Sequence, residues 1–164
     1  MKVFIANIDS ISKDPDAFTA LLSPTHRARV KKFQNQNRKL QFILGHLMAA
    51  NSGKKHTSIA HKDNLVVVAA ASNAPVGIDI ENGTVDRDFA AAAEFMHLPI
   101  PKDKKEFYRL FTFAEATYKL GTCAHCRQFM RHGDYVICIA STRHFDMPRL
   151  TKFDANALLP TEQE

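Results

Sequence analysis

Apolar and polar residues alternate along several short segments of this chain, and a period of two is typical of β-strands. The pattern, together with short apolar runs between turn residues, predicts strands at about 1–8, 65–71, 76–81 and 134–141, and a candidate edge strand at 149–153. In the segment 76–81, Ile78 and Ile80 alternate with the acidic residues Asp79 and Glu81. Successive side chains of a strand point to opposite faces, so the two carboxylates are expected to share one face.

Other segments have helical spacing or long stretches without Gly or Pro. They predict two short helices that begin at Asp14-Pro15 and Ser23-Pro24, and further helices at about 37–50, 85–96 and 104–120. A capping residue followed by Pro is a typical helix start, and Gly121 is a typical stop for the last helix. The tight connection 72–75, with the sequence Ser-Asn-Ala-Pro, predicts a hairpin between the strands on either side of it.

The length and composition are those of one compact globular domain spanning residues 1–164. The chain has 164 residues, of which 45% are hydrophobic and 24% are charged, which is ordinary for such domains. No apolar run approaches the ~20 residues of a membrane span, and the first residues lack the apolar core of a signal peptide. We therefore expect a cytoplasmic protein without a membrane partner. The polar tail at about 158–164 is expected to fray.

Three cysteines are present, and two of them form the motif Cys123-Ala124-His125-Cys126. A structural zinc site needs a second pair at suitable spacing, and only Cys138 remains, inside an apolar strand. A redox pair is the other functional reading, but the surrounding pattern is not thioredoxin-like. Two buried or half-buried thiols are the interpretation that we favour.

The chain is basic, with a net charge of +5 and a pI of about 9.2. A basic chain suggests nucleic-acid binding, but no stacking aromatic residues interleave with the bases in a recognisable module. The phenylalanines occupy core-like positions instead. The charge therefore indicates either a solvated basic face or a surface for a small anionic ligand and an acidic protein partner.

Carboxylates and a lysine recur at spacings that secondary structure can bring together. Glu115 and Lys119 are four residues apart in the predicted helix 104–120, so they lie on one face of it. With Asp79 and Glu81 they offer an oxygen-rich site for a hard cation such as Mg²⁺, beside a lysine suited to a phosphate. Taken singly, each pair could equally be a solvated surface feature. Together they predict a metal-assisted phosphate site.

The order of these motifs resembles the 4′-phosphopantetheinyl transferase superfamily. Its members carry a G-I/V-D-x-E strand followed by a W/F-S/T-x-K-E-A/S-x-x-K helix, which 77–81 and 111–119 resemble. Upstream, 58–69 is similar to the S-H-S turn and following strand of the family, with His61 at the histidine. Residues 22–33 and 38–45 resemble helices of the Sfp-type branch. The resemblance covers roughly residues 1–141.

The resemblance implies an α+β fold with two pseudo-symmetric halves, each a long helix packed on a three-stranded antiparallel sheet. The halves would span about 1–71 and 75–153. The implied activity is transfer of 4′-phosphopantetheine from coenzyme A to a serine of an acyl or peptidyl carrier protein, with Mg²⁺ (or Mn²⁺) as cofactor. The implied partners are coenzyme A and an acidic carrier protein, with no nucleic acid, and a monomer is expected.

The resemblance also implies residue roles. Asp79, Glu81 and Glu115 would hold the metal ion, and Glu115 would accept the proton of the carrier serine. Lys119 and His61 would contact the diphosphate as catalytic and coenzyme-binding residues. His26 and Arg29 would lie near the 3′-phosphate of coenzyme A.

The sequence departs from the family pattern at several accessory positions. Ala114 replaces the lysine before the glutamate, Phe111 replaces the tryptophan, and Ala60 and Lys62 replace the two serines beside His61. The loop at 51–57 is shortened where Sfp-type enzymes carry a segment near the adenine. A second class of function therefore stays open, namely a catalytically weak or inactive relative that binds a carrier protein or coenzyme A without transfer.

Overall fold

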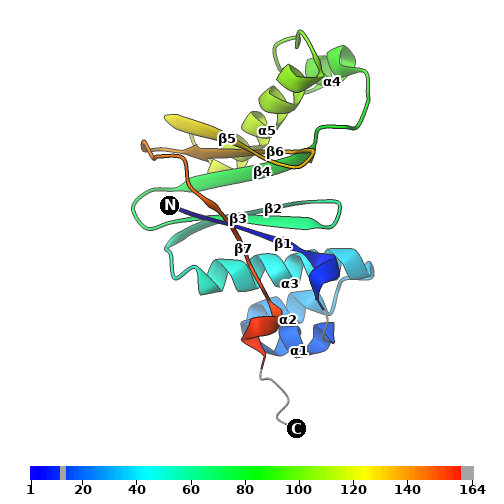
Figure 1. The fold of residues 1–164 in the computed structure, drawn as a ribbon, viewed down its shortest axis with the longest axis vertical. Coiled ribbons are helices and arrows are strands. Elements are labelled where there is room, and N and C mark those ends of the chain that lie inside the picture. The colour runs from blue at the N-terminus through cyan, green and yellow to red at the C-terminus, as the bar shows by residue number, and fades with distance from the viewer. Residues whose placement is uncertain (12–13, 160–164) are drawn as a thin grey trace.

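The chain forms two small sheets, each covered by one long helix (Figure 1). The structure is a computed structural model that describes residues 1–11 and 14–159. Figure 1 shows four layers in succession, with α5 above one sheet and α3 below the other. The α+β class expected from the sequence is therefore confirmed.

The first sheet is built around the N-terminal strand. In chain order the elements are β1 (Lys2–Asn7), η1 (Ile8–Ser10), α1 (Pro15–Ala20), α2 (Pro24–Val30), α3 (Gln36–Asn51), β2 (His56–Lys62) and β3 (Leu65–Ala71). The sheet has the order β2-β3-β1-β7, and β3 pairs antiparallel with both of its neighbours. The last strand, β7 (Leu150–Lys152), pairs parallel with β1 at the edge. The predicted edge strand is thus confirmed, and it makes the sheet four-stranded rather than three-stranded.

The second sheet is entirely antiparallel. Its elements are β4 (Val76–Asn82), α4 (Phe89–Phe95), α5 (Lys104–Leu120), β5 (Cys126–His132) and β6 (Tyr135–Ser141), and η2 (Asn156–Leu158) follows β7. The order is β4-β6-β5. Apart from β7, both sheets therefore share one topology: a strand, a long helix and two further strands follow each other, and the third strand lies between the other two.

The helix starts form where the sequence predicts them. Asp14, Ser23 and Asp103 are N-caps whose side chains accept hydrogen bonds from backbone N–H groups of the first turn. Gly121 ends α5 in the left-handed conformation, with φ at 75°, which costs glycine little. The exception is α4, which begins at Phe89 rather than near residue 85, because Asp88 is its N-cap.

The two sheets pack face to face through a shared apolar cluster. Its buried members come from both sheets: Val3, Ile5, Ala60, Leu65, Val67, Ala69, Ala71, Val76, Ile78, Ile80, Ile137 and Ile139. Separate clusters lie under α3 and under α5. The Ser58 hydroxyl also accepts a hydrogen bond from the backbone N–H of Ile78 at 3.1 Å, which joins β2 to β4.

The predicted hairpin at 72–75 is wrong. Strand β3 pairs with β1 and β2, whereas β4 pairs with β6, so residues 72–75 cross from one sheet to the other. The true hairpins join β2 to β3 and β5 to β6. Their turns contain Asp63 and Gly133, both with positive φ. His61 lies in strand β2, whereas the sequence placed it in a turn, and strand β5 was not predicted. Both strands are polar and partly exposed, so neither has a clear apolar pattern.

Leu158 and Leu159, at the start of the predicted fraying tail, pack partly against the cluster under α3. The rest of that tail lies outside the described residues. Within the described residues, no helix combines the length and the apolar character needed to cross a membrane.

Candidate functional site

The predicted acidic strand lies directly beneath the predicted catalytic helix. Gly77 makes this possible, since a Cβ at that position would stand 1.9 Å from the carbonyl oxygen of Ala116 in α5. Two residues further along β4, Asp79 points to the same face and meets Lys119 of α5. The close approach of strand and helix therefore sets the geometry of the site.

Asp79 is a buried carboxylate with only part of its bonding capacity used. Lys119 Nζ donates to Asp79 Oδ1 at 2.7 Å, whereas Oδ2 is buried without a hydrogen-bond partner among the described residues. Burial raises the pKa of Asp79 to about 6; the charge of Lys119 opposes this shift, and those of Glu81 and Glu115 add to it. The charges of the other two predicted acids and of Lys119 thus all act at Asp79.

Glu81 lies two residues after Asp79 in β4, on the same face of the strand, and it also contacts a lysine. Lys62 Nζ forms an ion pair with Glu81 Oε2 at 2.8 Å. The side chain of Glu81 is only 14% exposed. In the described part of the chain, Asp79 Oδ2 is thus buried without a donor, whereas Glu81 Oε2 is buried against the ammonium group of Lys62.

His61 faces the same region from β2. Arg38 Nη1 lies 2.9 and 3.0 Å from its two ring nitrogens. Partial burial lowers the pKa of His61, and the positive charges of Arg38 and Lys119 lower it further. His61 is therefore a neutral imidazole at pH 7 that accepts a hydrogen bond from Arg38.

Two adjoining pockets extend the site across the first sheet. One has a volume of about 500 Å³ and includes His61, Lys62 and Glu81 in its lining. The other, of about 370 Å³, is lined by Arg29, Phe33, Phe42, His46 and Ile59 among others. Both pockets also contain Arg38, Gln41 and His61. Because the two pockets share these residues, a groove runs from Glu81 of β4 to the face of α3; Asp79 does not line it.

Of the two predicted phosphate residues, Arg29 lines the far end of this groove, and His26 lies next to it against His46. The His26 ring stacks on His46 with centroids 3.8 Å apart, and the Arg29 guanidinium lies 5.2 Å from the centre of the Phe42 ring. Burial lowers the pKa of His46 to about 4, with further lowering by the charges of His26 and Arg29. The structure thus brings His26 and Arg29 together with His46, but not with the acids.

Sequence reasoning assigned no role to four residues of the groove: Arg38, Phe42, His46 and Lys62. Arg38, Phe42 and His46 are spaced four residues apart in α3, so they share one face of that helix. This spacing could have indicated from the sequence that the three side chains lie together. Lys62 carried no such signal, because its partner Glu81 is on a strand of the other sheet.

Among residues 1–11 and 14–159, no three Asp, Glu, His or Cys side chains are grouped as they would be around a metal ion. The buried oxygens of Asp79 and Glu81 nevertheless have the donor chemistry that Mg²⁺ prefers: Asp79 Oδ2 has no partner among the described residues, and Glu81 Oε2 is paired with Lys62. Glu115 is the third acid whose charge acts at Asp79. The oxygen donors fit a hard cation in kind, but Lys119 and Lys62 are paired with Asp79 and Glu81 in this conformation.

No cysteine lines the two pockets, but Cys138 lies opposite Asp79 in the pairing of β4 with β6. Cys123 is exposed, Cys126 is half-buried and Cys138 is buried, so the expectation of two buried or half-buried thiols is wrong for Cys123. Cys126 Sγ lies 3.9 Å from His144 Nδ1.

Comparison of the chain with protein-family models and with curated proteins finds no match to either.

Proposed function

We propose that this protein transfers 4′-phosphopantetheine from coenzyme A to a serine of an acyl or peptidyl carrier protein, as a small 4′-phosphopantetheinyl transferase-like enzyme. The proposal includes Mg²⁺ as cofactor, an acidic carrier as partner, and action as a monomer in the cytoplasm. It draws on the motif resemblance and on the arrangement of charges along the groove.

The observation that carries the proposal is the groove that joins a basic, aromatic end to a buried acidic end. Arg29, Arg38 and His46 line it on the α3 side, and Glu81 lines it on the β4 side. A long ligand with several phosphates needs cations along its length, whereas a phosphoryl-transfer centre needs acids that hold a metal ion. The cations that line the two pockets, and Glu81 at one end of them, support the proposal.

In this proposal, Glu115 accepts the proton of the carrier serine as its oxygen attacks the β-phosphorus of coenzyme A. The new bond joins serine Oγ to phosphorus, the diphosphate P–O bond breaks, and 3′,5′-ADP leaves with the electron pair. Bound Mg²⁺ would neutralise charge on the diphosphate, held by Asp79, Glu81 and Glu115. Lys119 and neutral His61 donate hydrogen bonds to the phosphate oxygens.

Aromatic rings and cations at the α3 end support a site for the nucleotide part of coenzyme A. Phe42 and His46 offer ring faces, and Arg29 lies beside them. Neutral His46 keeps a ring suited to stacking, while Arg29 supplies the charge for a 3′-phosphate. His26 shares this cluster through its contact with His46.

A second function, binding without transfer, is favoured by the two lysine contacts. Lys119 pairs with Asp79 and Lys62 pairs with Glu81, so both acids already have a cationic partner without a metal ion. A relative that has lost the reaction would keep this arrangement. It would bind coenzyme A or the carrier in the same groove.

Mass spectrometry of apo carrier proteins incubated with the protein, coenzyme A and Mg²⁺ separates the two functions. We expect a mass gain of one phosphopantetheine group on at least one carrier of a broad panel. Glu115→Gln should abolish the gain, because it removes both the proton acceptor and a negative ligand. Glu94→Gln, on the exposed surface of α4, is the matched control and should keep full activity.

No modification of any carrier, with either Mg²⁺ or Mn²⁺, would contradict the transferase proposal. Coenzyme A binding in that case would support the second function. Transfer by Glu115→Gln at the wild-type rate would remove Glu115 from the proposed mechanism.

A further inference from the structure

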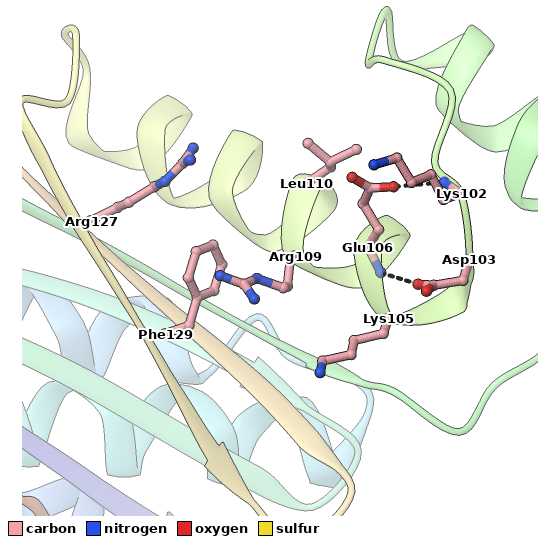
Figure 2. Close-up of a pocket in the computed structure, with 8 residues that line it drawn as sticks. All are labelled: Lys102, Asp103, Lys105, Glu106, Arg109, Leu110, Arg127 and Phe129. Carbon is pink, nitrogen blue, oxygen red and sulfur yellow. Dashed lines mark hydrogen bonds between the residues drawn. The ribbon is translucent and has the colours of Figure 1, made fainter.

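A second pocket lies on the opposite edge of the second sheet from the candidate site. It has a volume of about 360 Å³ and is formed by the first half of α5 and by β5. Figure 2 shows its lining residues. Strand β5 is the outer edge of the order β4-β6-β5, whereas the acids of the candidate site are on β4. The two sites are therefore separated by the width of the sheet.

Positive charge dominates this pocket. Lys102, Lys105, Arg109 and Arg127 line it together with Asp103 and Glu106, so four cations against two carboxylates leave a formal charge of +2. In the described part of the chain, none of the four cations makes an ion pair. Their charge is available to a ligand.

The two carboxylates serve the start of α5 instead. Asp103 Oδ1 accepts a hydrogen bond from the backbone N–H of Glu106 at 2.7 Å, and Glu106 Oε2 accepts one from that of Lys102 at 2.7 Å (Figure 2). These bonds resemble a capping box. The two carboxylates are therefore engaged by the backbone N–H groups of Lys102 and Glu106 at the helix start.

Aromatic rings hold the two guanidinium groups in place. The Arg109 guanidinium lies 4.6 Å from the centre of the Phe129 ring, and that of Arg127 lies 4.4 Å from the centre of the Phe113 ring. A guanidinium stacked on a ring keeps its N–H donors free at its edges. Two arginines are thus pre-ordered to receive carboxylates with little further loss of side-chain entropy.

The site also has an apolar part. Leu110 and Phe129 line the pocket and are half-buried, so they offer contact area beside the charges. Lys105 and Arg109 are one helical turn apart, about 6 Å along the axis. Cations spread over a loop, a helix and a strand suit several carboxylates on one partner better than a single phosphate.

We propose that this surface docks an acidic, amphipathic helix of a protein partner. Glutamates one turn apart on that helix pair with Lys105, Arg109 and Arg127, and an apolar side chain between them covers Leu110 and Phe129. This docking site does not depend on the proposed transfer reaction, because it shares no residue with the groove.

The test is fluorescence anisotropy with a fluorescein-labelled helical peptide that carries glutamates at positions i and i+4 with leucines between them. We expect Arg109→Glu/Arg127→Glu to weaken binding at least about tenfold. The control Lys54→Glu/Lys55→Glu makes the same change of net charge on the loop between α3 and β2, and should alter binding less than about twofold. Arg109→Gln/Arg127→Gln, a milder pair that preserves polarity, should also weaken binding, and circular dichroism checks that each variant is folded.

Four results would overturn the proposal. The first is no binding by the wild-type protein. The second is an equal loss in the Lys54/Lys55 control, which would indicate unspecific attraction. The third is equal binding of a peptide with glutamine in place of every glutamate. The last is displacement by millimolar inorganic phosphate at constant ionic strength, which would indicate a general anion site.

Discussion

At the scale of single residues, Asp79 is the position where stability and the proposed function conflict. Its carboxylate is buried, one of its oxygens has no partner among the described residues, and its pKa is raised to about 6. Raising the pKa of Asp79 from 3.8 to about 6 corresponds to roughly 3 kcal/mol. Ionised Asp79 therefore lowers the stability of the fold at neutral pH. Burial of an acid at such a cost is typical of a functional position.

The raised pKa gives Asp79 a defined pH dependence. The folded protein binds the Asp79 proton more tightly than the unfolded chain does, so the contribution of this group is most favourable below pH about 4 and declines as the pH rises to about 6. We predict that Asp79→Asn raises the free energy of unfolding at pH 7.5 by up to about 3 kcal/mol. The gain should vanish near pH 4, as measured by urea unfolding at both pH values.

Asp146→Asn is the control for this prediction, because the Asp146 side chain is fully exposed. It should show no such pH-dependent gain. In addition, Mg²⁺ should raise the unfolding midpoint of the wild-type protein more than that of Asp79→Asn, since a ligand of the folded state stabilises it. Asp79→Asn destabilised to the same extent at both pH values would mean that the Lys119 contact outweighs the cost of burial.

At the scale of secondary structure elements, the contact between β4 and α5 decides where the site residues lie. The absence of a side chain at Gly77 lets the strand approach the backbone of Ala116, which sets Asp79 against Lys119. A larger residue at position 77 would displace the backbone of α5. Backbone atoms in a packed helix cannot rotate out of the way as a side chain can.

We therefore predict that Gly77→Ala destabilises the protein by about 2 kcal/mol or more and impairs the candidate site. Gly45→Ala is the matched control, because a Cβ there meets the Ile59 side chain at 2.6 Å rather than backbone. That atom is Ile59 Cγ2, so the Ile59 side chain must change rotamer, and alanine offsets part of this cost because it favours the helix by about 1 kcal/mol relative to glycine. Thermal unfolding of both variants measures the difference; equal loss in the two would contradict the role given to Gly77.

At the scale of the whole molecule, the apolar cluster between the sheets couples the two halves. Ile78 and Ile139 of the second sheet belong to the same cluster as Val67 of the first. If either sheet unfolded, the apolar face of the other sheet would also become exposed to water. We therefore expect the two sheets to unfold together.

Hydrogen exchange tests this coupling. Ile78→Val should lower the free energy of unfolding by about 1 kcal/mol. The exchange free energies of amides in β3 and in β6 should fall by that same amount, because both report global unfolding. Ile100→Val, at a residue that is 76% exposed, should change neither. A fall confined to β6 would show that the two halves unfold separately.

The sequence alone determined the local features. Helix caps such as Asp103 and the stop at Gly121 formed as predicted, because capping is a contact between residues within one turn. The alternation in β4 likewise placed Ile78 and Ile80 in the core and Asp79 on the opposite face, since the period of a strand is fixed by its backbone.

Only the tertiary structure decided which elements meet. It separated β3 from β4, although four residues join them, because each strand gains more by pairing within its own sheet while sharing the apolar cluster between the sheets. It also placed Lys62 at Glu81 and Arg38 at His61. Contacts between residues so far apart in the chain depend on how whole elements pack, and the pattern along any one segment does not contain that information.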